Sequence, residues 1–575
     1  MKILFFSPHN YYLVHALPEA LVAESLKTKG SEIIYVGCNG ILNNYCLCMS
    51  AIASNSNVSQ KELICKTCKL YRDKIYNEFN FKSIMIDDFI SDLDRIEINN
   101  LIKNIDRSNI ENFKYLNYDV GKISLYEFLL NRKLNTTKIN LEEYDELKLY
   151  LKNTLIVLFA GSKIFESYKL DRLVTYNSFY SVNNMMCSIA SRNNIPHYML
   201  HAGSHHKYRL TEMTIFKGLS APFLINENIK WFEFSKYPIS KNYAQKAFEH
   251  VIYLLKTNSP WVYSIKSNRI SELNLKLKFG VKSNQKILLA LMSSADERFS
   301  ANLIGALPIY PASFFSSQLE WITFLIELAK SDKNIFLIIR VHPREFPNKR
   351  EKVLSKQAEE LTSMFSTLPT NCHVNYPSDN ISLHDIIKIT DVGLNGTTTA
   401  GLELLLFGIP VIIYDENQLF SYPREINLIA NNVIDYKIKI YQAIDSGMDI
   451  KYIVSAFRWV AYKSEVVSID ISDSYTTKNN LFKKYIIYFL NKLFKTSYFI
   501  SLKNRNKPPV EIDKLTYAIF NNQVSHIEKF QVNKTNNIDI EKTIIIKYFK
   551  KYLKVILHKN DLLFKIKVHN MIHKN

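Results

Sequence analysis

Short apolar runs alternate with amphipathic stretches along the first part of the chain. Lys2–Phe6 and Ser31–Val36 are apolar runs of strand length, and Leu17–Lys29 between them repeats its apolar residues at helical spacing. A strand, a helix and a strand joined by short links form a βαβ unit, whose strands lie parallel in one sheet. Further runs with the pattern of strands are Leu151–Phe159, Arg172–Tyr176 and His197–His201.

A second series of such runs begins after residue 282. Its expected strands are Lys286–Met292, Asn334–Val341, Asp391–Leu394 and Pro410–Tyr414, and its clearest helices are Leu319–Ala329 and Ser382–Ile389. Because the βα alternation starts twice, the pattern predicts an α/β protein with two Rossmann-like domains. Ligands in such folds bind at the carboxyl ends of the strands, so we expect a cleft between two facing sheets.

The pattern also gives domain boundaries. We expect an N-terminal domain over 1–220 with a polar helical insertion at about 60–150, a connector over 221–282, a second domain over 283–465 and a helical, basic extension over 466–575. A chain of 575 residues is too long for one core, because single domains rarely exceed about 250–300 residues.

Composition excludes several classes of protein. Glycine accounts for 14 of 575 residues, hydrophobic residues for 47% and charged residues for 22%, which excludes collagen-like repeats and wholesale disorder. The net charge of +19 suits nucleic acid, anionic lipid or a phosphorylated substrate. From Glu541 onward the chain has nine lysines against two carboxylates. The charge therefore favours a membrane surface over nucleic acid.

The seven cysteines are an odd number, which argues against a disulfide scaffold. Neither a signal peptide nor an apolar run of about 18 residues is present, so we expect a cytoplasmic protein, peripheral at most to the inner face of the plasma membrane. We expect no metal. A zinc site is a weaker alternative, and its candidate ligands are Cys46, Cys48, Cys65 and Cys68.

The segment Thr390–Asp415 has the strongest functional pattern. A short strand ends at Gly396, and Thr397, Thr398 and Thr399 follow where a helix is expected to begin. Free N–H groups at a helix start bind phosphate, and Glu403 farther along could accept hydrogen bonds from a ribose. The alternative is that the threonines cap a helix and the glycines form turns.

Two other strand ends in this domain carry candidate contacts. Arg340 and His342, followed by Pro343, offer a positive fork and a donor that can become charged beside phosphate. Ser293 and Ser294 follow the first strand of the domain. The alternatives are a solvated arginine with a capping histidine, and a plain polar turn.

These elements, in this order, resemble the donor domain of GT-B glycosyltransferases, above all those of bacterial capsular and surface-polysaccharide biosynthesis. The residues that carry the resemblance are Arg340, His342, Pro343, Gly396, Thr397, Thr398, Thr399, Glu403, Gly408 and Pro410. The resemblance covers about 180 residues and implies that they bind a nucleotide sugar. Many retaining members have a second acidic residue eight positions after the first. Val411 occupies that position here, so the stereochemical outcome stays open.

In GT-B enzymes the first domain supplies the acceptor side. His9 directly follows the first strand, and His201 begins a loop rich in histidine, lysine and arginine. We expect His9 and His201 to be the catalytic candidates, with His15 less favoured. The loop could instead be a solvated basic segment, and a zinc site from His201, His205 and His206 is a remote alternative.

Two C-terminal stretches, 481–503 and 544–572, are basic and amphipathic. Phe549, Tyr552, Leu553 and Ile556 share one helical face, and lysines occupy the others. Such a helix binds an anionic membrane surface or packs against the body of the protein, and the pattern favours neither.

The resemblance implies a glycosyltransferase that moves a sugar from an NDP- or CMP-sugar to a growing capsular or lipopolysaccharide-type glycan. No cofactor beyond the nucleotide sugar is expected, and no nucleic acid is an expected partner. The alternatives are a CDP-polyol phosphotransferase of the same architecture, a sugar-nucleotide epimerase, or a non-catalytic basic protein that binds membranes or nucleic acid.

Overall fold

The computed structural model describes residues 1–50, 58–209, 211–219, 230–256, 266–311, 313–348, 352–415, 417, 421–472 and 511–573. All elements named below lie within these ranges. The amphipathic stretch expected at 481–503 lies outside the described residues.

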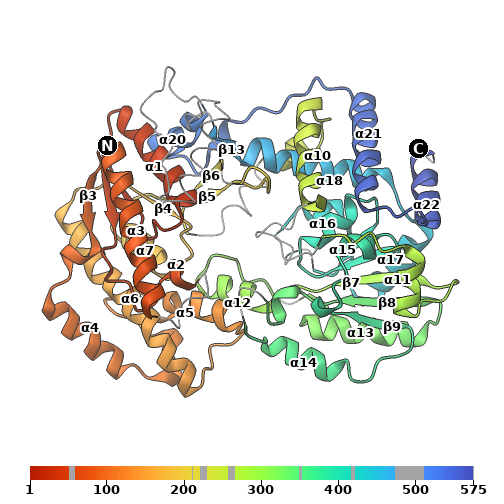
Figure 1. Cartoon of the computed structure of the whole chain (residues 1–575), viewed down its shortest axis with the longest axis horizontal. Helices are drawn as coiled ribbons and strands as arrows, with labels where there is room; N and C mark the ends of the chain where they lie inside the picture. Colours follow the sequence, from red (N-terminus) through yellow and green to blue (C-terminus); the bar gives the residue numbers. More distant parts are fainter. Residues whose placement is uncertain are drawn as a thin grey trace. The chain divides into compact units, whose positions relative to one another are not determined.

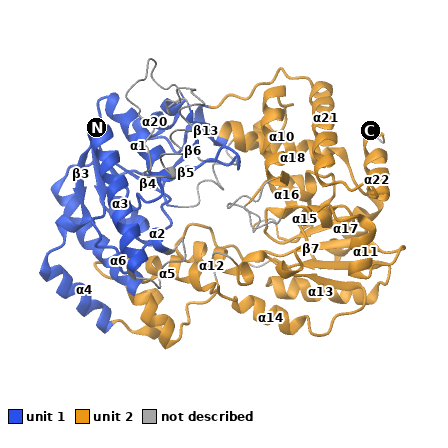
Figure 2. Cartoon of the chain, in the orientation of Figure 1, with its two compact units in different colours: residues 1–104, 149–219, 467–529 blue, residues 105–148, 220–466, 530–575 orange. Residues whose placement is uncertain are grey.

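The chain folds into two compact units, each built from separate stretches of sequence (Figures 1 and 2). Unit 1 consists of residues 1–104, 149–219 and 467–529, and unit 2 of residues 105–148, 220–466 and 530–575. The structure thus assigns part of the expected insertion to unit 2 and divides the expected C-terminal extension between both units.

Unit 1 contains one sheet with the strand order β13-β6-β5-β4-β1-β2-β3. Its strands are β1 (Lys2–Phe6), β2 (Glu32–Gly37), β3 (Lys82–Met85), β4 (Arg172–Tyr176), β5 (His197–Ala202), β6 (Glu212–Lys217) and β13 (Ile469–Asp470). The five strands from β5 to β3 are parallel, and β6 and β13 are antiparallel additions at one edge. This is a Rossmann-like sheet, as predicted.

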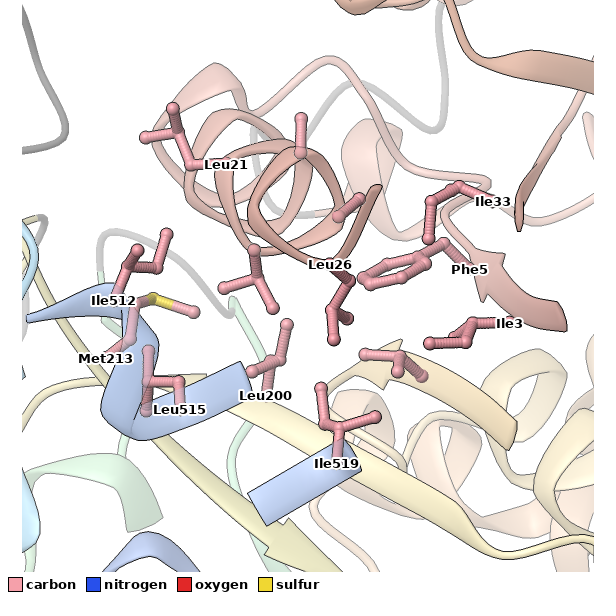
Figure 3. Close-up of a cluster of buried hydrophobic side chains, with 14 of the residues drawn as sticks. Ile3, Phe5, Leu21, Leu26, Ile33, Leu200, Met213, Ile512, Leu515 and Ile519 are labelled. Atoms are coloured by element: carbon pink, nitrogen blue, oxygen red, sulfur yellow. The ribbon is translucent and has the colours of Figure 1, made fainter. Parts of the chain in front are cut away.

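Helices complete unit 1. They are α1 (Leu13–Thr28), α2 (Leu47–Ser50), α3 (Val58–Phe79), α4 (Asp92–Asn104), α6 (Leu141–Ser167, which begins in unit 2), α7 (Ser181–Arg192) and α20 (Ile512–Phe520). Figure 3 shows Leu21 and Leu26 of α1, Phe5 of β1 and Leu515 and Ile519 of α20 in one buried cluster. The late segment around α20 is therefore part of the core of unit 1 and not an appendage.

Unit 2 contains a wholly parallel sheet with the order β12-β11-β10-β7-β8-β9. Its strands are β7 (Lys286–Leu291), β8 (Ile335–Arg340), β9 (Cys372–Asn375), β10 (Val392–Asn395), β11 (Val411–Ile413) and β12 (Leu428–Ile429). If the six strands are numbered 1 to 6 along the chain, their order in the sheet is 6-5-4-1-2-3, as in the Rossmann fold. Successive strands are added on one side of β7 up to β9 and on its other side from β10 onward, so the order of addition reverses between β7 and β10. The prediction of two Rossmann-like domains is confirmed.

The helices of unit 2 surround this sheet and extend beyond it (Figure 1). They are α5 (Val120–Arg132), α9 (Trp231–Phe234), α10 (Lys241–Lys256), α11 (Glu272–Phe279), α12 (Ala295–Leu303), α13 (Gln318–Ser331), α14 (Lys356–Met364), α15 (Leu383–Ile387), α16 (Ala400–Leu405), α17 (Val433–Ser446), α18 (Ile450–Tyr462), α21 (Ile538–Ile556) and α22 (Leu562–His573).

Side-chain caps fix where several of these helices begin. Ser271, Ser317 and Asn537 accept hydrogen bonds from backbone N–H groups in the first turns of α11, α13 and α21. Gly280 ends α11 in the left-handed conformation. Such caps satisfy N–H and C=O groups that a helix end leaves without partners.

Polar contacts explain why part of the expected insertion belongs to unit 2. The guanidinium of Arg344 donates to the Leu130 carbonyl of α5 over 2.7 Å. The buried Lys133 ammonium donates to the carbonyls of Phe346 and Val353. The segment 105–148 is thus fixed to residues some 210 positions later in the chain.

One expectation about the elements was wrong, and a second was incomplete. Leu151–Phe159 was expected as a strand but lies inside the long helix α6, because a short apolar run buried on several sides has the same pattern in either structure. The insertion expected at 60–150 is largely helical, as α3, α4 and α5 show, but it also supplies the edge strand β3, Lys82–Met85.

The expected amphipathic helix at the C-terminus is confirmed as α21, and its apolar face is covered. Phe549, Tyr552, Leu553 and Ile556 are buried, and α21 packs against α10 and α18. The Tyr552 hydroxyl donates to the Leu406 carbonyl. Of the two alternatives, packing against the body is the one that the structure shows.

Candidate functional site

Three neighbouring strands of unit 2 end at the same level. In the strand register, Asn395 of β10 pairs with Leu291 of β7, which pairs with Arg340 of β8. The chain leaves β10 and β7 in opposite directions, and ligands of open α/β sheets bind at such a reversal. Ser293, Arg340, His342 and Thr397, all predicted site residues, lie at or directly after these strand ends.

Ser293 and Thr397 meet at the point of reversal. The two hydroxyl oxygens are 2.7 Å apart, and the Thr397 N–H donates to Ser293 Oγ over 3.2 Å. Gln318 of α13 fixes the Ser293 backbone, because its amide accepts from Ser293 N–H and donates to Ser293 C=O. The sequence predicted both residues but could not show that they touch.

Arg340 supplies the positive charge of the site. Its guanidinium donates to the Asn375 side chain and, over 3.2 Å, to the Ile381 carbonyl. Burial lowers the pKa of Arg340 to about 10, and the carboxylates of Glu403 and Asp379 oppose that shift. Arg340 therefore keeps its charge at neutral pH in a fixed position, unlike the solvated arginine of the alternative interpretation.

His342 is uncharged in this structure. Burial first, and then the charges of Arg344, Arg340 and Lys133, lower its pKa to about 3. Its Nδ1 accepts from the Arg344 N–H over 3.3 Å, so the proton of the neutral ring lies on Nε2. His342 thus caps the short turn Pro343–Glu345 and presents an N–H donor rather than a positive charge.

Ser294 is engaged elsewhere. Its hydroxyl donates to Asp296, whose carboxylate forms a buried ion pair with Arg344 at 2.8 Å. The Glu345 carboxylate accepts from Ala295 N–H, so a carboxylate already occupies the start of α12. These contacts favour a structural role for Ser294 over contact with a phosphate.

Thr398 and Thr399 lie in a turn, because α16 begins only at Ala400. Thr398 exchanges hydrogen bonds with the Asn395 side chain through its N–H and C=O. Thr399 is exposed and forms no side-chain cap. The helix was expected to begin within the three threonines. The structure instead has a turn there, which hydrogen bonds to the buried Asn395 side chain stabilise.

Glu403 has a partner that the sequence did not suggest. Its Oε2 lies 2.7 Å from Nε2 of His384, a buried residue of α15. The pair fixes the orientation of the carboxylate that is predicted to accept the ribose. No pattern in the sequence connects positions 384 and 403, since the two helices meet only in the folded unit.

In unit 1 the predicted histidines gather around Tyr176 at the end of β4. The Tyr176 ring stacks on His15 at 4.5 Å and on His201 at 5.9 Å. Burial, followed by the charge of Arg209, lowers the pKa of His15 to about 4. His15, which was less favoured, is therefore as close to the strand ends as His201.

His9 follows β1 and is half-buried. Burial lowers its pKa to about 4, so its ring is neutral at neutral pH. Nearby, Glu19 of α1 is buried against Tyr35, and burial raises the pKa of Glu19 to about 8. Glu19 was not predicted, because a single acidic residue within an apolar helix pattern shows no function on its own.

Several of the candidate metal ligands contact one another or an aromatic ring. The Cys48 thiol forms hydrogen bonds with the thiols of Cys46 and Cys68, which raise its pKa. His205 is buried and packs against Tyr208. Among the described residues, no three or more His, Cys, Asp or Glu side chains are grouped so that they could hold a metal ion.

The chain was compared with known proteins. No protein-family model and no curated protein matches it. Among solved structures, the β-Kdo 2,4-transferase KpsC of Thermosulfurimonas dismutans is 13% identical, and the match covers 51% of this chain and 79% of that one with a TM-score of 0.31.

Two further matches are to solved structures whose descriptions name UDP-GlcNAc or UDP. The UDP-GlcNAc 2-epimerase of Neisseria meningitidis is 12% identical over 81% of this chain and 98% of its own, with a TM-score of 0.29. The S. aureus MnaA structure with UDP is 11% identical over 86% and 98%, with a TM-score of 0.28. Scores of this size assign the chain to no family, so the functional inference depends on the site geometry.

Proposed function

We propose that the chain is a glycosyltransferase that takes a sugar from a nucleotide-sugar donor. The observation that supports this most directly is the contact between Ser293 and Thr397 at the reversal between β7 and β10. Arg340 is the last residue of the adjacent strand β8, and His342 lies just after that strand. Hydroxyls, an imidazole N–H and a fixed guanidinium at one sheet edge form a set of donors that suits a diphosphate.

In the proposed reaction an acceptor hydroxyl attacks the anomeric carbon of the donor sugar, and the bond to the nucleotide phosphate breaks. Arg340 and the Nε2–H of His342 stabilise the charge that develops on the leaving phosphate. Glu403, oriented by His384, binds the ribose. A phosphate beside His342 would favour the charged imidazole and so raise its low pKa.

His9 and His201 of unit 1 are the proposed acceptor-side residues, and we propose that one of the two takes the proton of the acceptor hydroxyl. The acceptor that we propose is a growing surface glycan, extended at the cytoplasmic face of the membrane. No cofactor is needed for this chemistry.

Thermal unfolding with added nucleotide tests the donor site. At a nucleotide concentration of about 100 Kd, binding stabilises the folded state by about 2.7 kcal/mol, so we expect UDP, GDP, CDP or CMP to raise the Tm. Arg340→Ala should weaken binding about 10- to 100-fold, because it removes a charged hydrogen-bond donor. The Tm is measured by differential scanning fluorimetry over a nucleotide titration.

The matched control is Arg95→Ala, which removes an exposed arginine of α4 that has only a surface ion pair. It should respond to nucleotide like the wild type. If none of the four nucleotides raises the Tm, or if both variants respond alike, the proposed donor site is wrong.

The product distinguishes the alternatives. Release of nucleoside diphosphate from an NDP-sugar, or of CMP from a CMP-sugar, only when acceptor is present indicates glycosyl transfer. Release of CMP from a CDP-polyol indicates the phosphotransferase. Conversion of the sugar nucleotide without acceptor indicates the epimerase.

A further inference from the structure

The first turns of α11 and α22 bind each other reciprocally. The Glu272 carboxylate at the start of α11 accepts from the N–H groups of Leu563 and Phe564 over 2.8 and 2.9 Å. The Asp561 carboxylate before α22 accepts from Glu272 N–H over 2.8 Å. Figure 1 shows both helices next to each other in unit 2. Residues that directly follow Glu272 and Asp561 therefore lie on one local surface.

That surface carries large aliphatic side chains in solvent. The exposed fractions are 61% for Leu273, 70% for Leu277, 64% for Leu562, 54% for Leu563 and 55% for Ile566. Leu273 and Leu277 are one helical turn apart, as are Leu562 and Ile566. Isolated exposed leucines are ordinary, but contiguous ones indicate an interaction surface. We call these five residues the α11/α22 surface.

The exposed charges around this surface are positive. Residues 269–282 and 557–573 contain seven Lys or Arg residues, counted along the sequence, and only two carboxylates, Glu272 and Asp561. Both carboxylates are buried, where they accept the bonds given above. Lys278, Lys282 and Lys559 are exposed. An aliphatic surface among lysines complements the interface of an anionic bilayer, whose negative headgroups attract lysine side chains.

We propose that the α11/α22 surface docks on an anionic membrane. The surface differs from the apolar face of α21, which is buried inside unit 2. A second copy of the chain is disfavoured as the binding partner, because its own α11/α22 surface is also surrounded by positive charges and would be repelled. No described helix is long and apolar enough to cross a bilayer, and docking from one side requires none. The proposal does not depend on the transfer reaction.

Vesicle flotation of the full chain tests it. We expect the protein to float with vesicles of phosphatidylcholine and phosphatidylglycerol but not with phosphatidylcholine alone. Leu562→Gln/Ile566→Gln should lower the partition coefficient about tenfold or more, since it removes apolar area that would enter the interface. Leu277→Gln should lower it as well, because α11 shares the surface.

The control is Leu93→Gln/Ile96→Gln on α4, where equally exposed aliphatic residues lie among acidic ones. It should float like the wild type. Equal flotation of the wild type and the Leu562/Ile566 variant would overturn the proposal, as would equal losses in both double variants or equal binding to neutral vesicles. Far-UV circular dichroism confirms that each variant is folded.

Discussion

Lys388→Met is expected to destabilise unit 2 by about 3–5 kcal/mol, because it leaves buried carboxylates without their cation. The Lys388 ammonium lies 3.1 Å from Asp561 and 3.7 Å from Asp385, and all three side chains are fully buried. It also donates to the carbonyls of Ile270 and Ile556. Removal of the Lys388 ammonium therefore takes a positive partner from two carboxylates and a hydrogen-bond donor from two carbonyls.

Urea unfolding followed by tryptophan fluorescence measures this loss. All four tryptophans, Trp231, Trp261, Trp321 and Trp459, belong to the sequence of unit 2, so the signal reports on that unit. Lys330→Met is the control, because Lys330 forms only an exposed pair with Glu327, and such pairs contribute about 0–1 kcal/mol.

Asp561→Asn in the Lys388→Met background distinguishes the unpaired charge from lost packing. It removes the carboxylate that Lys388 neutralised, so it should recover part of the lost stability. If Lys388→Met were no worse than Lys330→Met, the buried network would not be what fixes α22 to α15 and to residues 267–272.

A strand could be predicted from the sequence where turn residues on either side left an apolar run too short for a helix. Arg172–Tyr176 was predicted residue for residue, because turn residues follow it and a helix could not fit. Leu151–Phe159 failed because α6 continues on both sides, and the helix could be recognised only from the polar turns before it. Lys82–Met85 was not predicted as a strand, because none of its four residues is buried and Lys82 and Ser83 interrupt any apolar run.

Residues of the candidate site could be chosen from the sequence, but their contacts could not. Ser293, Arg340 and Thr397 could be chosen because each follows or ends a strand, and strand ends of a parallel sheet share one edge. That Ser294 turns to Asp296 and that Glu403 pairs with His384 depends on side-chain directions in the folded unit. Four glycines close together at 393–408 suggested a backbone open to phosphate, and the structure separates their roles.

Gly401 and Gly396 should respond in opposite ways to a methyl group. At Gly401 a Cβ would lie 2.0 Å from the Tyr422 hydroxyl and 2.6 Å from Asn395 Nδ2. At Gly396 the nearest atom, Gln318 Oε1, would be 3.5 Å away, an ordinary contact. Gly401 is therefore required by the protein itself, whereas Gly396 has room that a bound phosphate could use.

Gly401→Ala is expected to cost about 3 kcal/mol, since the overpacked site must displace a buried hydroxyl. Tyr422 accepts from Asn395 over 2.9 Å and donates to Asn427 over 3.0 Å, so its movement breaks both bonds. The better helix propensity of alanine returns only about 1 kcal/mol. Tyr422→Phe combined with Gly401→Ala should recover part of the loss, and urea unfolding measures each variant.

Gly396→Ala should change the free energy of unfolding by less than about 0.5 kcal/mol and weaken nucleotide binding about tenfold, because the methyl group occupies the space beside Ser293 and Thr397. Equal stability of Gly401→Ala and Gly396→Ala would contradict the packing argument. Unchanged nucleotide binding in a fully folded Gly396→Ala would instead place the phosphates away from the β7–β10 reversal. The two glycines thus separate what the fold requires from what a ligand requires.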